Sequence, residues 1–169
     1  MAADVSGGEI IVTADPDVVA GADRIVLPGD GAFPACKDAL LRAAGMQMMA
    51  TRGMEYRETA GFDWIGGTVK AIDPGQDALK VPHMGWNDLV ITGDAHPVLK
   101  GIDTGDHAYF VHSYQFNVTI PSERLAHCHY GQDITAIVGR DTMIGTQFHP
   151  EKSQAAGLRM IRNFLTWKP

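Results

Sequence analysis

Along the first third of the chain, short apolar runs alternate with stretches of helical character. The run from Arg24 to Leu27 is continuously apolar after its first residue, which is typical of a parallel strand buried on both faces. Asp15-Pro16 indicates a capped helix start, because proline is well tolerated just after a capping residue. A further strand is predicted at Glu9 to Val12, and helices from Phe33 to about Ala44 and from Gln47 to Arg52.

The pattern changes in the second half, where β-branched and aromatic residues form short runs bounded by Gly, Asp or Pro. Strands are predicted at Trp64 to Ile72, Leu89 to Thr92, Ala108 to Asn117, Leu125 to Tyr130, Ile134 to Val138 and Thr142 to Phe148. An amphipathic helix is predicted from Gln154 to Trp167, because its apolar residues follow helical spacing. We therefore expect a single α/β domain over residues 1–169, with a β-rich second half.

Composition and charge exclude several classes of protein. The chain is 45% hydrophobic and 20% charged, and its formal charge of -6 argues against nucleic acid or an anionic membrane as partner. It has no apolar run near about 18 residues, and its first ten residues lack the features of a signal peptide. The two cysteines, Cys36 and Cys128, do not make a disulfide scaffold, so a reducing cytoplasm is expected.

The most specific chemical pattern is the segment Gly145-Thr-Gln-Phe-His-Pro-Glu-Lys-Ser153. We predict that His149 and Glu151 lie on a strand ending at Pro150, where residues two apart point the same way. The histidine can then take a proton from a nucleophile while the carboxylate holds its other ring nitrogen. This spacing predicts the base and the orienting carboxylate of a nucleophilic triad.

A second candidate feature is the turn Pro28-Gly-Asp-Gly31, which follows the strand predicted at Arg24 to Leu27. The turn would place backbone amides at the carboxyl end of the sheet, where open α/β sheets bind ligands. Taken alone, this segment predicts only a turn. His83 and His112 are expected to be structural rather than catalytic.

Four segments occur in the order found in one family: Pro28-Gly-Asp-Gly-Ala-Phe33, Pro82-His-Met-Gly-Trp-Asn87, Tyr109-Phe-Val-His-Ser-Tyr114 and Gly145 to Ser153. From about Glu9 onwards the chain resembles the glutaminase subunits of imidazole glycerol phosphate synthase, which are class I glutamine amidotransferases. The resemblance implies a flavodoxin-like α/β fold and hydrolysis of glutamine to glutamate and ammonia for histidine biosynthesis. It implies no cofactor and no metal.

The resemblance also implies a role for individual residues. His149 would be the general base and Glu151 its orienting carboxylate, and the turn with Gly29 and Asp30 resembles the loop that offers a backbone N–H to an oxyanion. A cyclase subunit would form a heterodimer with the chain and receive the ammonia. The residues that resemble glutamine contacts are Gln47, Ser113 and Tyr114, and those that resemble the cyclase-facing surface are Trp86, Tyr109 and Lys152.

Two departures from the family pattern bear on activity. The family places its nucleophilic cysteine in Gly-x-Cys-x-Gly-Met-Gln, whereas Ala43 holds that position here and only Gly45-Met46-Gln47 remains. The helix and strand that lead to this elbow are missing, since the helix predicted from Phe33 runs straight into Gly45. The first strand and Gly-rich turn of the family are also absent from Met1 to Gly8. We therefore expect the chain to hydrolyse glutamine poorly or not at all.

Neither cysteine is a convincing replacement. Cys36 lies near the start of a predicted helix, which lowers a thiol pKa, but in the wrong element relative to His149. In His127-Cys128-His129 the cysteine would face away from both histidines on a strand, which suits no single metal ion. The open alternatives are a working glutaminase, a non-catalytic partner of the cyclase, a defective or incompletely represented chain, and an amidotransferase of another pathway.

Overall fold

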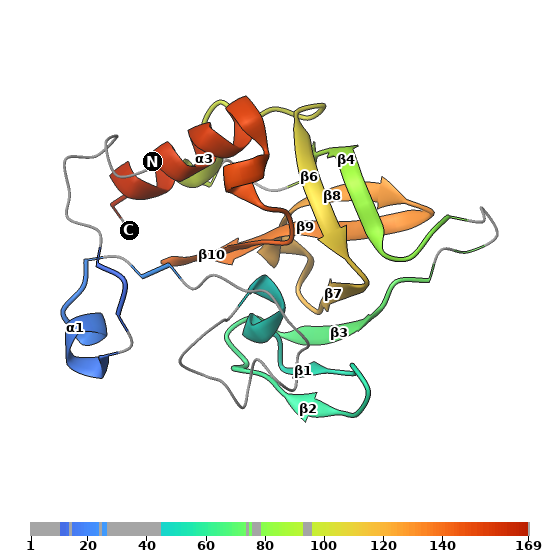
Figure 1. Cartoon of the computed structure of the whole chain (residues 1–169), viewed down its shortest axis with the longest axis horizontal. Helices are drawn as coiled ribbons and strands as arrows, with labels where there is room; N and C mark the ends of the chain where they lie inside the picture. Colours follow the sequence, from blue (N-terminus) through green and yellow to red (C-terminus); the bar gives the residue numbers. More distant parts are fainter. Residues whose placement is uncertain are drawn as a thin grey trace.

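A computed structural model describes residues 11–13, 15–23, 25–26, 45–73, 75, 79–92 and 96–168 (Figure 1). The helix predicted from Phe33 to Ala44 lies outside the described residues. So do the turn containing Gly29 and Asp30, Cys36 and Ala43.

Among the described residues up to Val26, the predicted helix start at Asp15 is confirmed, but the predicted strands are not. Helix α1 (Pro16–Ala20) is capped by Asp15, whose side chain accepts a hydrogen bond from the backbone N–H of Asp17. The predicted strands at the start are wrong over their described residues, which are exposed and lie in no strand: Ile11, Val12, Ile25 and Val26. An apolar run forms a buried strand only where neighbouring strands cover it.

One sheet of the described residues has four strands. Its strand order is β2-β1-β3-β7, and only the β1–β3 pair is parallel within it. The strands are β1 (Arg52–Gly53), β2 (Thr59–Ala60), β3 (Gly67–Ala71) and β7 (Tyr114–Val118). The helix predicted from Gln47 to Arg52 is shorter and of another type: a 3-10 helix, η2 (Met46–Met49), precedes β1. The extended backbone of Ala50 ends it after one turn.

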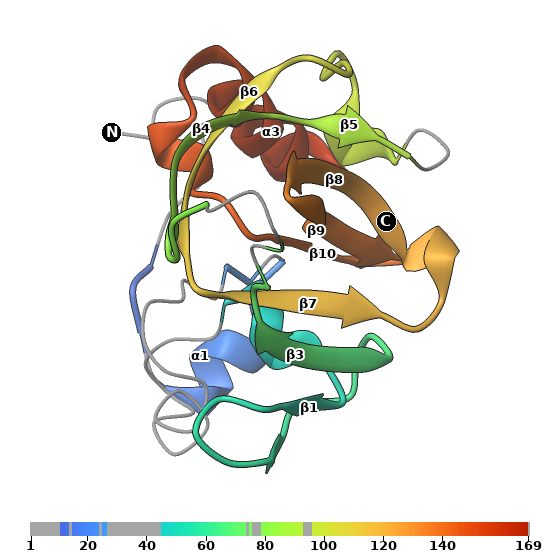
Figure 2. The same ribbon diagram turned by 90° about the vertical axis from the view of Figure 1, so that its right-hand side faces the viewer.

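Two antiparallel sheets complete the β-structure. One has the order β10-β9-β8-β5, and the other is the pair β4–β6. These strands are β4 (His83–Asp88), β5 (Val90–Ile91), β6 (His107–His112), β8 (Arg124–Tyr130), β9 (Gln132–Arg140) and β10 (Met143–Thr146). Helix α3 (Gln154–Thr166) lies on the opposite side of the molecule from β1 and β3, with β8, β9 and β10 between them (Figures 1 and 2).

The predicted strand from Ala108 to Asn117 is in fact two strands. β6 pairs with β4, whereas β7 pairs with β3, so the chain passes from one sheet to another at Ser113. The Ser113 carbonyl accepts a hydrogen bond from the N–H of Ile72 at this crossing, 2.9 Å away. Continuous apolar spacing conceals the break, and the sequence does not predict β4 because Gly85 and polar residues interrupt its pattern.

The core of the described residues consists of two clusters. One joins β6, β8 and β9 to α3 and includes Phe110, Phe148 and Met160. The other surrounds η2 and includes Met46, Phe116 and other side chains of β3, β7 and β9. Short 3-10 helices join β5 to β6, β7 to β8 and β10 to α3: η3 (Pro97–Leu99), η4 (Pro121–Glu123) and η5 (Pro150–Lys152). Among the described residues, no helix is long and apolar enough to cross a membrane.

Candidate functional site

The predicted His149–Glu151 pair forms in the structure, but its predicted place on a strand is wrong. β10 ends at Thr146, and His149 lies just before the first residue of η5. The Nδ1 atom of His149 is 3.0 Å from Oε1 of Glu151. The helical turn of η5, rather than strand alternation, brings the side chains together, because Pro150 fixes the backbone at the helix start.

This arrangement leaves one ring nitrogen of His149 for chemistry. Glu151 accepts a hydrogen bond from Nδ1–H, so Nε2 is the nitrogen that can take a proton from a nucleophile. This tautomer is assigned from the hydrogen bond. The side chain of His149 is 30% exposed, so a small molecule can reach it.

The turn that carries the pair is held on both sides. The Ser153 hydroxyl donates to the carbonyl of His149 (2.7 Å) and accepts from the N–H of Tyr109 on β6 (3.0 Å). On the other side, Gly157 of α3 packs so closely that a Cβ atom there would overlap the carbonyl of Pro150. Ser153 therefore fixes the turn that carries the pair, a role that sequence reasoning missed although this residue ends the motif that contains His149.

Gln47 lies close to this turn through a second contact that the sequence did not reveal. Its Nε2 donates to the carbonyl of Tyr114 and to Oε1 of Gln147, both at 2.8 Å. Gln147 is two residues before His149, so the predicted substrate residues Gln47 and Tyr114 and the predicted base belong to one region. Gly145 allows this approach, since a Cβ atom there would lie 2.9 Å from Cγ of Met46.

Glu55 is a carboxylate in the same region that no sequence motif indicated. It is 9% exposed and lies between β1 and β2. Burial raises the pKa of the Tyr114 phenol, and the nearby negative charge of Glu55 raises it further. Ser113 immediately precedes Tyr114, at the crossing between sheets.

The predicted cyclase-facing aromatics lie together on an exposed face. Trp86 and Tyr109 are cross-strand partners, with ring centroids 5.7 Å apart and edge-to-face geometry. Trp86 is 47% exposed, so it is not a core side chain. The neighbouring pair, Met84 and Val111, is also exposed. We call these four residues the outer face of the β4–β6 pair. Lys152 is exposed in η5.

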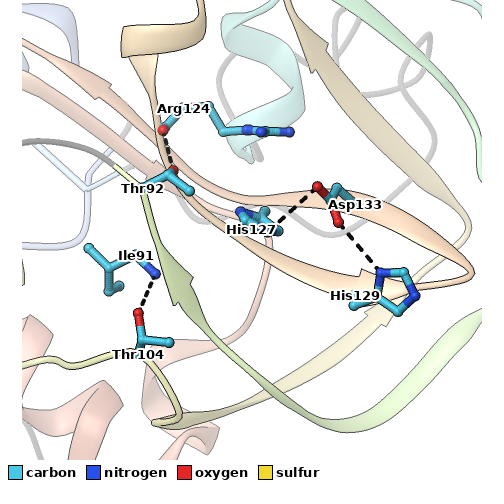
Figure 3. Close-up of polar contacts among 7 residues, drawn as sticks. All are labelled: Ile91, Thr92, Thr104, Arg124, His127, His129 and Asp133. Atoms are coloured by element: carbon cyan, nitrogen blue, oxygen red, sulfur yellow. Dashed lines mark hydrogen bonds and ion pairs between the residues drawn. The ribbon is translucent and has the colours of Figure 1, made fainter.

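Cys128 cannot act as a nucleophile in this fold. It is fully buried, and burial raises the pKa of its thiol to about 12, with the charge of Asp133 contributing. His127 and His129 instead approach Asp133 from two sides, at 3.6 and 3.5 Å (Figure 3). The predicted alternation along this strand is confirmed. Within the described part of the chain, no group of three or more His, Cys, Asp or Glu side chains could hold a metal ion.

Comparison with known proteins identifies the class of protein. Residues 44–167 match the family model described as Glutamine amidotransferase class-I, so the chain belongs to that family. Within it, the chain is a homologue of imidazole glycerol phosphate synthase subunit HisH. The HisH protein of Cereibacter sphaeroides is 60% identical, and that of Ruegeria pomeroyi 59% identical, each over 100% of this chain and 90% of the relative.

The aligned stretch with the Cereibacter sphaeroides protein spans 191 residues, more than the 169 of this chain, so that relative has internal residues that this chain lacks. A solved structure of a Thermoplasma acidophilum protein described as part of a GMP synthase is 18% identical. The match covers 59% of this chain and 47% of the other, with a TM-score of 0.46.

Proposed function

We propose that this chain is a glutaminase-type subunit of imidazole glycerol phosphate synthase that binds its cyclase but does not hydrolyse glutamine. One observation carries the second half of the proposal. The His149–Glu151 pair has the geometry of a base and its orienting carboxylate, yet Ala43 stands where the family has its cysteine. The base therefore has no thiol to activate.

The chemistry that the base would serve needs that thiol. A thiolate would attack the carboxamide carbon of glutamine and form a thioester, while His149 returns a proton to the departing ammonia. Water would then cleave the thioester to give glutamate. Cys128 cannot substitute because it is buried and its thiol pKa is raised to about 12. His149 can at most assist a water molecule.

We assign glutamine binding to the region between η2 and β7. Gln47 and Tyr114 lie side by side there, because Nε2 of Gln47 donates to the Tyr114 carbonyl, and we assign both residues to the glutamine site. Ser113 and the turn containing Gly29 and Asp30 are assigned to the same site on the family resemblance. The site would hold glutamine even though the hydrolytic step is absent.

We assign cyclase binding to the outer face of the β4–β6 pair. It exposes two adjacent cross-strand pairs that are apolar or aromatic, which is typical of an interaction surface. Lys152 follows the carboxylate Glu151 in η5, so the proposed interface borders the proposed glutamine site. This assignment makes the chain one half of a heterodimer with the cyclase, which we place in the cytoplasm because two cysteines without a disulfide scaffold fit a reducing compartment.

The test uses the full chain, equimolar cyclase and two nitrogen sources. With glutamine we expect ammonia release far below the ~1–10³ per second of typical enzymes, because loss of a nucleophile costs about 10⁶-fold in a well-studied serine hydrolase. With ammonium, the cyclase should turn over normally in the complex. Enzyme-like ammonia release from glutamine would refute inactivity, as would covalent trapping of Cys36 by a glutamine analogue. Failure to bind the cyclase would refute the assigned partner.

A further inference from the structure

Two histidines that the proposed chemistry does not use are buried side by side. His83 on β4 and His112 on β6 are cross-strand partners, 2% and 8% exposed. Nδ1 of His83 lies 3.0 Å from Nε2 of His112. The ring of His83 also stacks on Phe110 and Tyr130, at centroid distances of 4.8 and 4.1 Å. The dyad lies on the opposite side of the strand pair from the outer face.

The surrounding hydrogen bonds determine where the protons lie. The amide of Asn87 is a donor and lies 3.2 Å from Nε2 of His83, so this nitrogen accepts. His83 must then donate from Nδ1 to Nε2 of His112. His112 in turn donates from Nδ1 to the carbonyl of Tyr114, 2.8 Å away. Every hydrogen bond is satisfied only when both rings are neutral and protonated at Nδ1.

The dyad is well suited to remain neutral. Burial lowers the pKa of both imidazoles, that of His83 to about 4. Phe110, Tyr130 and the amide of Asn87 are uncharged at neutral pH, and they pack or bond against the dyad. A proton added to either ring would replace an acceptor with a donor and break the chain of hydrogen bonds.

The chain of hydrogen bonds continues into the proposed glutamine site. The Tyr114 carbonyl accepts from His112 and also from Nε2 of Gln47, both at 2.8 Å. Gln47 then donates to Gln147, two residues before His149. A carbonyl with two donors has both lone pairs occupied, so its orientation and that of each donor are interdependent.

We propose that His83 and His112 are positioning residues, a neutral relay that orients the Tyr114 carbonyl and, through it, the amide of Gln47. The relay joins β4, which carries the outer face, to η2, which carries Gln47. The role of the relay in substrate binding rests on the assignment of Gln47 to the glutamine site. The existence of the relay does not depend on that assignment.

The first test is nuclear magnetic resonance of the imidazole nitrogens in the unmodified full chain, with cyclase added if the free chain self-associates. We expect both rings to be neutral Nδ1–H tautomers at pH 7, with a scalar coupling across the hydrogen bond from Nδ1 of His83 to Nε2 of His112. Titration of either ring at the ordinary pKa of about 6.5, without that coupling, would overturn the relay.

The second test separates the two halves of the relay by substitution. His112→Asn retains a donor near the Nδ1 position for Tyr114, whereas His112→Gln retains an acceptor near the Nε2 position for His83 but loses that donor. We expect His112→Gln to shift the side-chain amide resonance of Gln47 and to weaken glutamine binding about fivefold, the size expected for one ordinary hydrogen bond. His112→Asn should stay within about twofold of the unmodified chain.

His107→Gln is the matched control, because His107 lies on the same strand but is exposed. It should leave the Gln47 resonance and glutamine binding unchanged. Equal effects of the two His112 variants, or no effect of either, would overturn the proposal. If the variants do not fold, the measurement on the unmodified chain decides. An unmodified chain that shows the coupling but binds no glutamine would refute the glutamine site and leave the relay intact.

Discussion

Among the side chains of the outer face, Trp86 is expected to contribute most to the free energy of cyclase binding. It pairs edge-to-face with Tyr109 and exposes 47% of its surface, so a partner could bury it fully. We predict that Trp86→Ala weakens cyclase binding by about 2 kcal/mol or more, the usual threshold of an interface hot spot. Titration calorimetry with purified cyclase measures this loss.

Trp64 provides the control for Trp86. It is 38% exposed, stacks on Phe62 at a centroid distance of 4.6 Å, and lies between β2 and β3, which belong to another sheet than the β4–β6 pair. Trp64→Ala should leave cyclase affinity unchanged. Full affinity after Trp86→Ala, or an equal loss in both variants, would remove the outer face as the interface.

We predict that the β4–β6 pair opens more easily in acid, because it buries His83 and His112 in their neutral forms. The pKa of His83 is about 4 in the folded chain and 6.5 when the ring is exposed. Between pH 4 and pH 6.5, a locally opened β4–β6 pair therefore binds more protons than the folded pair. Stability is therefore fully present above about pH 6.5 and decreases as the pH falls towards about 4. Amide hydrogen exchange in β4 and β6, corrected for its intrinsic pH dependence, measures the free energy of opening.

His83→Gln should reduce this pH dependence by about one proton, because one of the two titrating rings is removed. His107→Gln should leave it unchanged, since His107 is exposed. A free energy of opening that stays constant from pH 7 to pH 4.5 would contradict the prediction.

At Gly157, a residue without a side chain, helix α3 packs directly against backbone. Gly157 faces the turn that carries His149, and an added Cβ would overlap the Pro150 carbonyl, a backbone atom that cannot rotate away. We predict that Gly157→Ala destabilises α3 by about 1–3 kcal/mol, the usual cost of overpacking. Hydrogen exchange protection of the helix amides measures the loss.

Leu158→Ala tests the neighbouring position on the same helix. Helical spacing places Leu158 on the apolar face, but the residue is 58% exposed, so its truncation should change protection within about 0.5 kcal/mol. Unchanged protection in Gly157→Ala would show that the helix can move away from the turn at little cost.

Considered as one molecule, the free chain is expected to be aggregation-prone or partly molten. The family resemblance implies that its sequence lacks segments of the parallel sheet, and a close relative has internal residues that this chain lacks. A lost central strand exposes backbone groups and apolar faces on its neighbours. Typical domains have only about 5–15 kcal/mol of stability to offset this. A monodisperse sample with one sharp thermal transition would contradict this prediction.

The features of the fold and of the site that the sequence predicted well depend on residues close together in the chain. The cap at Asp15, the pairing of His149 with Glu151 and the two-sided alternation at Cys128 all involve neighbours two residues apart or fewer. Even there, the supporting element could differ, since a 3-10 turn replaced the strand predicted at His149. Local patterns restrict which side chains can meet, but different backbones can satisfy the same pattern.

The sequence by itself determined the family, the pairing of His149 with Glu151, the absence of a cysteine at position 43, and most strands of the second half. Only the tertiary structure decided that His83 meets His112, 29 residues away, and that Gln47 meets Gln147, 100 residues away. It also decided that the chain changes sheets at Ser113. Such contacts depend on strand register and on which sheets pack together, and spacing along the chain carries no direct information about either.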